Sequence, residues 1–177
     1  ERYMRGVPRL VVETAADLIH TKVPGMQVGL LATAVWANKA QDEVGSATNA
    51  AYTALFSGNA DVKAFIEDGL VDFVAVEATG SQSDGAIPFN VVASWWGKVA
   101  SGADIPLYLV HGADKLGSGA AGWNDGGQLV AQLVAAKEIA GYKGSAFNSL
   151  SKLSADPNGA TTNLLAYFKD QTSAQFI

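Results

Sequence analysis

The stretch VDFVAVEATGSQSDGAIPFNVVASWWGKVASGADIPLYLVH, residues 71–111, decides the fold. It begins with a short apolar run at 71–77 and continues through a polar, glycine-containing loop at 79–85. A helical pattern at 89–100 and a second apolar run at 106–111 follow. Short apolar runs bounded by turn residues are typical of strands buried on both faces. The order strand, helix, strand therefore predicts two parallel strands joined by a right-handed crossover.

The same alternation extends from this unit in both directions along the chain. Upstream lie, in order, a helical pattern at 7–19, a strand-like run at 26–32 and two helical patterns at 47–56 and 61–69. Downstream lie a helical pattern at 127–140, a strand-like run at 144–150 and a helical pattern at 161–168. These segments predict an α/β protein in which four consecutive parallel βα units follow one leading helix. Residues 1–177 are expected to form a single unit.

Four parallel βα units fit two architectures. One is half of an eight-stranded TIM barrel, and the other is a small open doubly wound sheet of the flavodoxin type. The length of 177 residues favours the open sheet, because a whole barrel takes about 250 residues. No glycine-rich phosphate turn follows any of the predicted strands, so the pattern does not indicate nucleotide binding.

The composition narrows the class of partner and of chemistry. Hydrophobic residues make up 49% of the chain and charged residues 16%, which predicts a folded protein. A net charge of −5 without a Lys/Arg cluster argues against nucleic acid, and no apolar run is long enough for membrane insertion. The chain has no cysteine and no metal-ligand spacing such as H-E-x-x-H, so we expect no metal and no cofactor.

The chain begins Glu1-Arg2-Tyr3-Met4, without a basic and then apolar leader. A start of this kind is typical of a piece processed or excised from a longer protein. We therefore expect further sequence before Glu1.

Several collinear segments resemble the family-10 glycosyl-hydrolase-like barrel proteins of bacteria. The segments are Val28-Gly29-Leu30, Val35-Trp36-Ala37-Asn38, Gly45-Ser46-Ala47-Thr48, Gly69 to Val74, Trp95-Trp96, Leu107 to Ala113, Trp123 with Gln128 and Gln132, and Gly144 to Ser149. The resemblance implies that this chain is the C-terminal half of the barrel, strands five to eight. Strands one to four would then precede Glu1.

The resemblance also implies a function. It points to an extracellular or cell-envelope carbohydrate-active protein that hydrolyses a polysaccharide or cell-wall glycan with carboxylate acid/base groups. After Val74-Ala75 the family carries Pro-Gln-x-Tyr-Trp, whereas this chain has Val76-Glu77-Ala78-Thr79-Gly80. The loss of these aromatic residues favours an alternative, a non-catalytic glycan-binding or structural module. A self-contained flavodoxin-like ligand-binding domain is the third hypothesis.

A half-barrel has two open sheet edges and apolar surface that the other half would cover. We therefore expect either the N-terminal half of the barrel or a second copy of this chain as a partner, and the resemblance implies a carbohydrate as the other.

Candidate catalytic residues lie at or just after predicted strand ends, because the carboxyl ends of barrel strands converge on one mouth. Hydrolysis of a glycosidic bond generally needs two carboxyl groups, one as general acid and one as base or nucleophile. Glu77 ends an apolar strand and is the first candidate, and Asp114 is the second. A hydrogen-bonded structural acid or a helix cap is the alternative interpretation of each.

Five further residues near strand ends are predicted to bind substrate. They are Trp36, Asn38, His111, Trp123 and Asn148. An indole offers a flat apolar face to a sugar ring, and a neutral imidazole offers one donor and one acceptor. The alternative is that the two tryptophans cover loop backbone and that His111 is a buried residue with satisfied hydrogen bonds.

Overall fold

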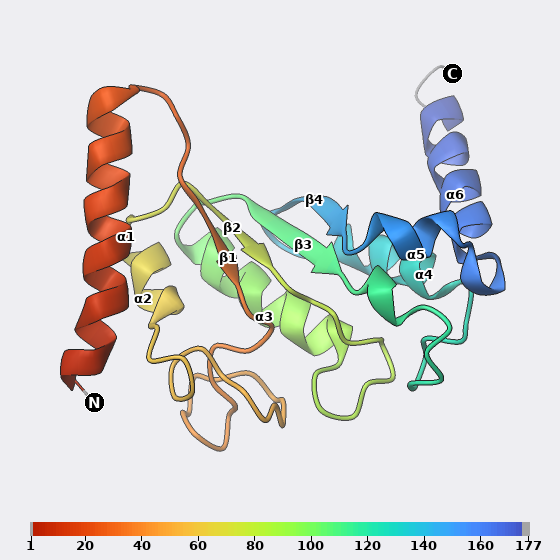
Figure 1. Cartoon of the computed structure of the whole chain (residues 1–177), viewed down its shortest axis with the longest axis horizontal. Helices are drawn as coiled ribbons and strands as arrows, with labels where there is room; N and C mark the ends of the chain where they lie inside the picture. Colours follow the sequence, from red (N-terminus) through yellow and green to blue (C-terminus); the bar gives the residue numbers. More distant parts are fainter. Residues whose placement is uncertain (1, 175–177) are drawn as a thin grey trace.

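One four-stranded parallel sheet organises the protein, in a computed structural model that describes the backbone of residues 2–174 and the side chains of residues 4–171 (Figure 1). The strands are β1 (Gly29–Ala32), β2 (Phe73–Val76), β3 (Leu107–His111) and β4 (Tyr142–Phe147). Each neighbouring pair is parallel, and the order in the sheet is β1-β2-β3-β4. The structure confirms the α/β class with four consecutive parallel units.

Six helices and two short 3-10 turns accompany the strands in the described residues. They are α1 (Arg2–Lys22), α2 (Val62–Glu67), α3 (Phe89–Gly102), α4 (Gln128–Ala136), α5 (Leu150–Ser154) and α6 (Ala160–Ala174), with short 3-10 turns η1 (Ala113–Lys115) and η2 (Pro157–Gly159). Helices α3 and α4 lie on one side of the sheet, and α1 and α6 stand at its opposite ends (Figure 1). Within residues 2–174, no helix combines the length and the apolar character needed to cross a bilayer.

The two faces of the sheet differ in how far they are covered. Successive residues of a strand point to opposite faces. Val74, Val76, Leu107 and Leu109 face the helices and are completely buried in one core with Trp96 of α3. On the opposite face, called here the open face, Leu31 is 61% exposed and Tyr108 36% exposed. The core therefore lies between the sheet and its helices, and the other face is left largely open by the described residues.

The strand order bears on the choice between the two expected architectures. A doubly wound sheet reverses its strand order at one point, and its ligand lies in the crevice there. The described strands run in sequence without a reversal. The ligand site expected for the flavodoxin-type alternative is therefore missing from this sheet.

The helix expected at 47–56 does not form, which corrects the sequence prediction. Its backbone N–H groups pair with distant carbonyl groups: Ala54 donates to Val35 and Leu55 donates to Trp36, both at 2.9 Å. The amide side chain of Asn38 takes both backbone groups of Ala50. Tertiary hydrogen bonds thus replace the local bonds that a helix would make.

Several boundaries also differ from the prediction. Strand β4 begins at Tyr142 and ends at Phe147, two or three residues before the expected 144–150 run at each end. The backbone after Phe147 turns into α5, which the sequence pattern did not predict. The remaining predicted helices and strands are present. Helices α1 and α6 extend beyond the expected 7–19 and 161–168, whereas β1 begins three residues later and α4 ends four residues earlier than expected.

Candidate functional site

A pocket of about 370 Å³ opens at the carboxyl ends of β1 and β2. Three segments build it: the residues directly after β1, the middle of the long β1–α2 loop, and the β2–α3 loop. The lining residues are Thr33, Ala34, Val35, Ala50, Ala51, Tyr52, Glu77, Thr79, Asp84, Ala86 and Ile87. Because parallel strands in sequential order present their carboxyl ends at one edge, successive loops meet there.

Glu77 enters this pocket from β2. Its backbone N–H donates to the carbonyl of Ala32 at 2.9 Å, so the ladder between β1 and β2 continues to Glu77. Alternation along the strand then places Glu77 on the same face as Phe73 and Ala75, which is the open face. The side chain is partly buried. The first candidate acid thus lies at a strand end, on the open face and in a pocket.

A second carboxylate in the same pocket, Asp84, was missed by the sequence analysis. Its Oδ1 atom accepts the backbone N–H groups of Ala86 and Ile87, each at 2.9 Å, and this fixes the β2–α3 loop. The residue lies in the polar loop at 79–85, which the sequence treats only as a connection. The signal that could have found it is the strand order, which brings the loops after neighbouring strands together.

Two further lining residues carry polar groups. Tyr52 is an exposed aromatic residue on the pocket wall, and the hydroxyl of Thr33 is buried with no hydrogen-bond partner among the described residues. Lys115 approaches from the end of β3, and its Nζ atom donates to the carbonyl of Thr79 at 2.9 Å. The pocket region therefore holds carboxylate, hydroxyl, phenol and ammonium groups together.

Asn38 holds one wall of the pocket without lining it. Its Nδ2 atom donates to the carbonyl of Ala50 at 2.9 Å and to Gln41, and its Oδ1 atom accepts from Ala50 N–H at 2.8 Å and from Thr48. The side chain is buried and every hydrogen-bonding group on it is used. Asn38 is thus placed to fix the loop that carries Ala50.

A hydrogen bond between backbone groups connects the β1–α2 loop to the β2–α3 loop. The N–H of Asn49 in the β1–α2 loop donates to the carbonyl of Ala86 in the β2–α3 loop at 2.8 Å. The two loops therefore form one connected rim of the pocket.

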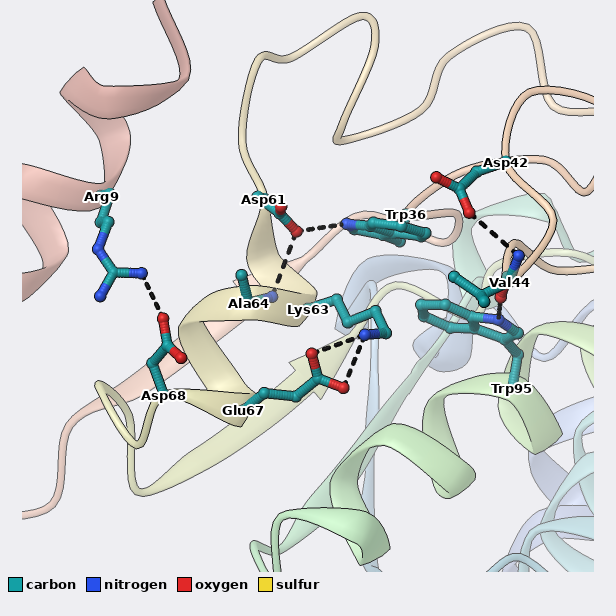
Figure 2. Close-up of polar contacts among 10 residues, drawn as sticks. All are labelled: Arg9, Trp36, Asp42, Val44, Asp61, Lys63, Ala64, Glu67, Asp68 and Trp95. Carbon is teal, nitrogen blue, oxygen red and sulfur yellow. Dashed lines mark hydrogen bonds and ion pairs between the residues drawn. The ribbon is translucent and has the colours of Figure 1, made fainter. Parts of the chain in front are cut away.

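Trp36 lies behind the pocket wall, among helices. It is only 5% exposed, its ring stacks on Trp95 at 5.7 Å between centroids, and its Nε1 atom donates to Asp61 at 2.9 Å (Figure 2). Lys63 lies over its ring at 5.8 Å. Trp36 therefore points toward α2 and α3 and not into the pocket.

His111 also faces the helices, because it shares the covered face of β3 with Leu107 and Leu109. It is completely buried between the rings of Phe89 and Phe147, with centroids at 5.3 and 5.2 Å. Its nitrogens bond Gln132 at 2.7 Å and Ser145 at 2.6 Å. Burial lowers the pKa of His111 to about 4, against a smaller opposing effect of the Gln132 bond, so the imidazole is neutral near pH 7.

The remaining predicted residues lie around β3 and β4. Trp123 is buried in a second apolar cluster with Leu116, Leu129 and Leu164. Asp114 and Asn148 are exposed, and the backbone N–H of Asp114 donates to the carbonyl of Asn148 at 2.6 Å. These two join the ends of β3 and β4, one strand away from the pocket.

Glu77 alone among the predicted site residues lines the strand-end pocket. The catalytic role of Asp114 stays a prediction, as do the substrate contacts of Trp36, Asn38, His111, Trp123 and Asn148. The described residues contain no group of three or more His, Asp or Glu side chains placed to hold a metal ion.

Comparison of the sequence with known proteins finds similar proteins but no matching family. No family model matches the chain. The chain is similar to "Glycosyl hydrolase YngK" of Bacillus subtilis strain 168, with 27% identity over 155 residues that cover 87% of this chain and 30% of that protein. It is also similar to "Glycosyl hydrolase DigH" of Escherichia coli K12, with 28% identity over 115 residues that cover 65% of this chain and 26% of that protein.

The chain therefore spans less than a third of the length of these curated relatives. Their names support a glycosyl-hydrolase-like relationship.

Proposed function

We propose that this chain is the C-terminal half of a (β/α)8 barrel that hydrolyses a polysaccharide or cell-wall glycan. The observation that carries the proposal is Glu77, which stands at a strand end on the open face and lines a pocket together with Asp84. In a barrel the open face becomes the packed interior, and the strand ends surround the active site. The sequential parallel order and the names of the relatives support this proposal.

Glycoside hydrolysis generally needs two carboxyl groups, and in this proposal they are those of Glu77 and Asp84. Asp84 accepts both of its backbone bonds at Oδ1, so Oδ2 is the oxygen that can face water or the sugar. Glu77 lacks such backbone bonds among the described contacts and serves as the general acid. Asp114 is the alternative second carboxylate.

The rest of the proposal follows the family resemblance. The protein is of the family-10-like type and acts outside the cell or in the cell envelope. Asn148 and the loop after β4 contact a more distant part of the glycan. Trp36, Asn38 and His111 support the pocket loops from behind, whereas Trp123 packs in the second apolar cluster.

The decisive experiment is glycan turnover by the natural polypeptide that contains these residues, compared with its Glu77→Gln variant. Because a positioned general acid contributes about 10²- to 10⁴-fold, we expect Glu77→Gln to lower kcat by at least about a hundredfold. Glu138→Gln, at an exposed acid two residues after the end of α4, is the matched control and should leave kcat unchanged. Asp84→Asn should also lower kcat. Unchanged turnover in Glu77→Gln would remove Glu77 from the mechanism.

The missing Pro-Gln-x-Tyr-Trp residues favour one other function, a non-catalytic glycan-binding module. The same experiment separates the two. Glycan binding without turnover in the unmodified protein identifies the non-catalytic module.

A further inference from the structure

Three tryptophans pack in series where the β1–α2 loop meets α3. Trp36 stacks on Trp95 with an interplanar angle of 14°, and Trp95 meets the edge of Trp96 at 4.9 Å. Each indole N–H donates to an acceptor. Trp36 donates to Asp61 and Trp95 to Val44 O at 2.8 Å (Figure 2). Trp96 donates to Ala34 O, also at 2.8 Å. These contacts fix the ring of Trp95, which is the outer ring and is only partly buried.

Two hollows of about 390 and 370 Å³ adjoin Trp95 and share Gly45, Trp95 and Lys98. We call the larger hollow the Trp95 groove, and its polar and aromatic lining is Lys39, Ser46, Asn90, Ser94, Trp95 and Lys98. It runs along the side of α3 that faces away from the sheet. Neither hollow shares a lining residue with the strand-end pocket, so the groove is a separate site.

The Trp95 groove is positively charged on a chain whose net charge is −5. Lys39 and Lys98 line it, and no Asp or Glu does. The ion pairs of the described residues include neither lysine. In the smaller hollow the charge of Lys63 is balanced by Glu67 at 2.6 Å. Lys39 and Lys98 are therefore the lysines of the two hollows that have no ion-pair partner among the described residues.

We infer that the Trp95 groove binds a carboxylated sugar unit of a glycan, at a distance from the bond that is cleaved. An indole presents an apolar surface to the C–H groups of a pyranose ring, and ammonium groups pair with a carboxylate. The exposed amide of Asn90 and the exposed hydroxyl of Ser94 supply donors and acceptors for sugar hydroxyls. The inference rests on the proposed function, because that proposal supplies the glycan.

Titration calorimetry of the protein with tetragalacturonate tests the inference, with cellotetraose as the neutral probe of similar length. We expect the charged probe to bind more tightly than the neutral one, and added salt to weaken its binding, because salt screens exposed charges. The double variant Lys39→Gln/Lys98→Gln should weaken binding of the charged probe by at least about tenfold. Lys152→Gln, an exposed lysine on α5, is the matched control and should bind as the unmodified protein does.

The inference is overturned if the double variant binds the charged probe as tightly as the unmodified protein, or if neither binds it. Equal affinity for cellotetraose, or for tripolyphosphate as a charged probe without a sugar, also overturns it. Turnover that depends on Glu77 without lysine-dependent binding refutes this inference alone. Lysine-dependent binding without turnover in any variant supports the groove and refutes the hydrolase proposal.

Discussion

His111 sits in a directed chain of hydrogen bonds. Gln132 donates through Nε2 to the carbonyl of Gly80 at 2.9 Å, so its Oε1 atom faces Nδ1 of His111 and accepts the imidazole proton. The other nitrogen, Nε2, then accepts from the hydroxyl of Ser145, which in turn accepts from Tyr142 at 2.8 Å. A neutral imidazole donates to Gln132 and accepts from Ser145. A protonated imidazole has two N–H donors, so the hydroxyl of Ser145 could no longer donate to it.

The free energy of unfolding should therefore decrease as the pH is lowered from about 6.5 to about 4. In this window the unfolded chain binds a proton at His111 and the folded chain does not, because burial lowers the folded pKa from 6.5 to about 4. A difference of that size corresponds to about 3 kcal/mol of unfolding free energy across the window. Urea denaturation at several pH values measures it.

The variant His20→Gln removes the other histidine and should keep the same pH slope. His111→Gln lowers the stability near pH 7 but should flatten the slope between pH 6.5 and 4. An equal slope in both variants would contradict the assignment to His111.

Sequence alone could have placed His111 correctly. Leu107, Leu109 and His111 alternate along β3, and a face that buries two leucines against α3 also buries the third residue. The same alternation puts Glu77 on the face opposite Val74 and Val76. Position at a strand end predicts which residues lie near the pocket. The alternation of side chains between the two faces of the strand predicts which of them point to the open face.

At the scale of elements, Asp61 connects a helix start to the tryptophan series. Its Oδ1 atom caps α2 by accepting from Ala64 N–H at 3.2 Å, and the same atom accepts from Nε1 of Trp36. A single carboxylate oxygen thus fixes both the first turn of α2 and the buried indole (Figure 2).

Asp61→Ala should lower the unfolding free energy by roughly 2–4 kcal/mol. Loss of a helix cap costs about 1 kcal/mol, and a buried indole N–H left without an acceptor costs about 1–3 kcal/mol more. Asp61→Asn keeps an acceptor oxygen and should lose less than about 1 kcal/mol. Urea denaturation compares the two variants, and equal losses would show that the carboxylate charge matters more than the acceptor.

The strands and most helices were predictable because each is a local apolar pattern of the right period. The segment at 47–56 was not, because Asn38 and the backbone of Val35 and Trp36 take its hydrogen bonds from a distance. The pocket wall at Tyr52 depends on these same contacts. Loop geometry set by tertiary hydrogen bonds leaves no periodic signal in the sequence.

At the scale of the whole molecule, we expect the open face and the sheet edges to be covered by a partner surface. Leu31 and Tyr108 expose apolar surface on the open face, and Leu10, Val11 and Leu18 expose more along α1. Contiguous apolar surface and unpaired strand edges promote association. In the proposed barrel the other half covers them.

We expect the 177-residue chain by itself to self-associate as its concentration rises. Leu31→Lys should shift the chain toward monomer, because a charge on the open face opposes burial there. Val134→Lys, on an exposed position of α4, should not. Size-exclusion chromatography with light scattering measures both variants. A monomer at every concentration would argue against the half-barrel.

The β1–α2 loop carries its own internal support, since Asn38 anchors Ala50 by two bonds that do not involve the sheet. Substitutions at Ala51 or Tyr52 can therefore reshape the pocket while Glu77 keeps its place on β2. In the proposed hydrolase, a preference for a new sugar could then arise through a short surface segment, while the proposed catalytic groups stay unchanged.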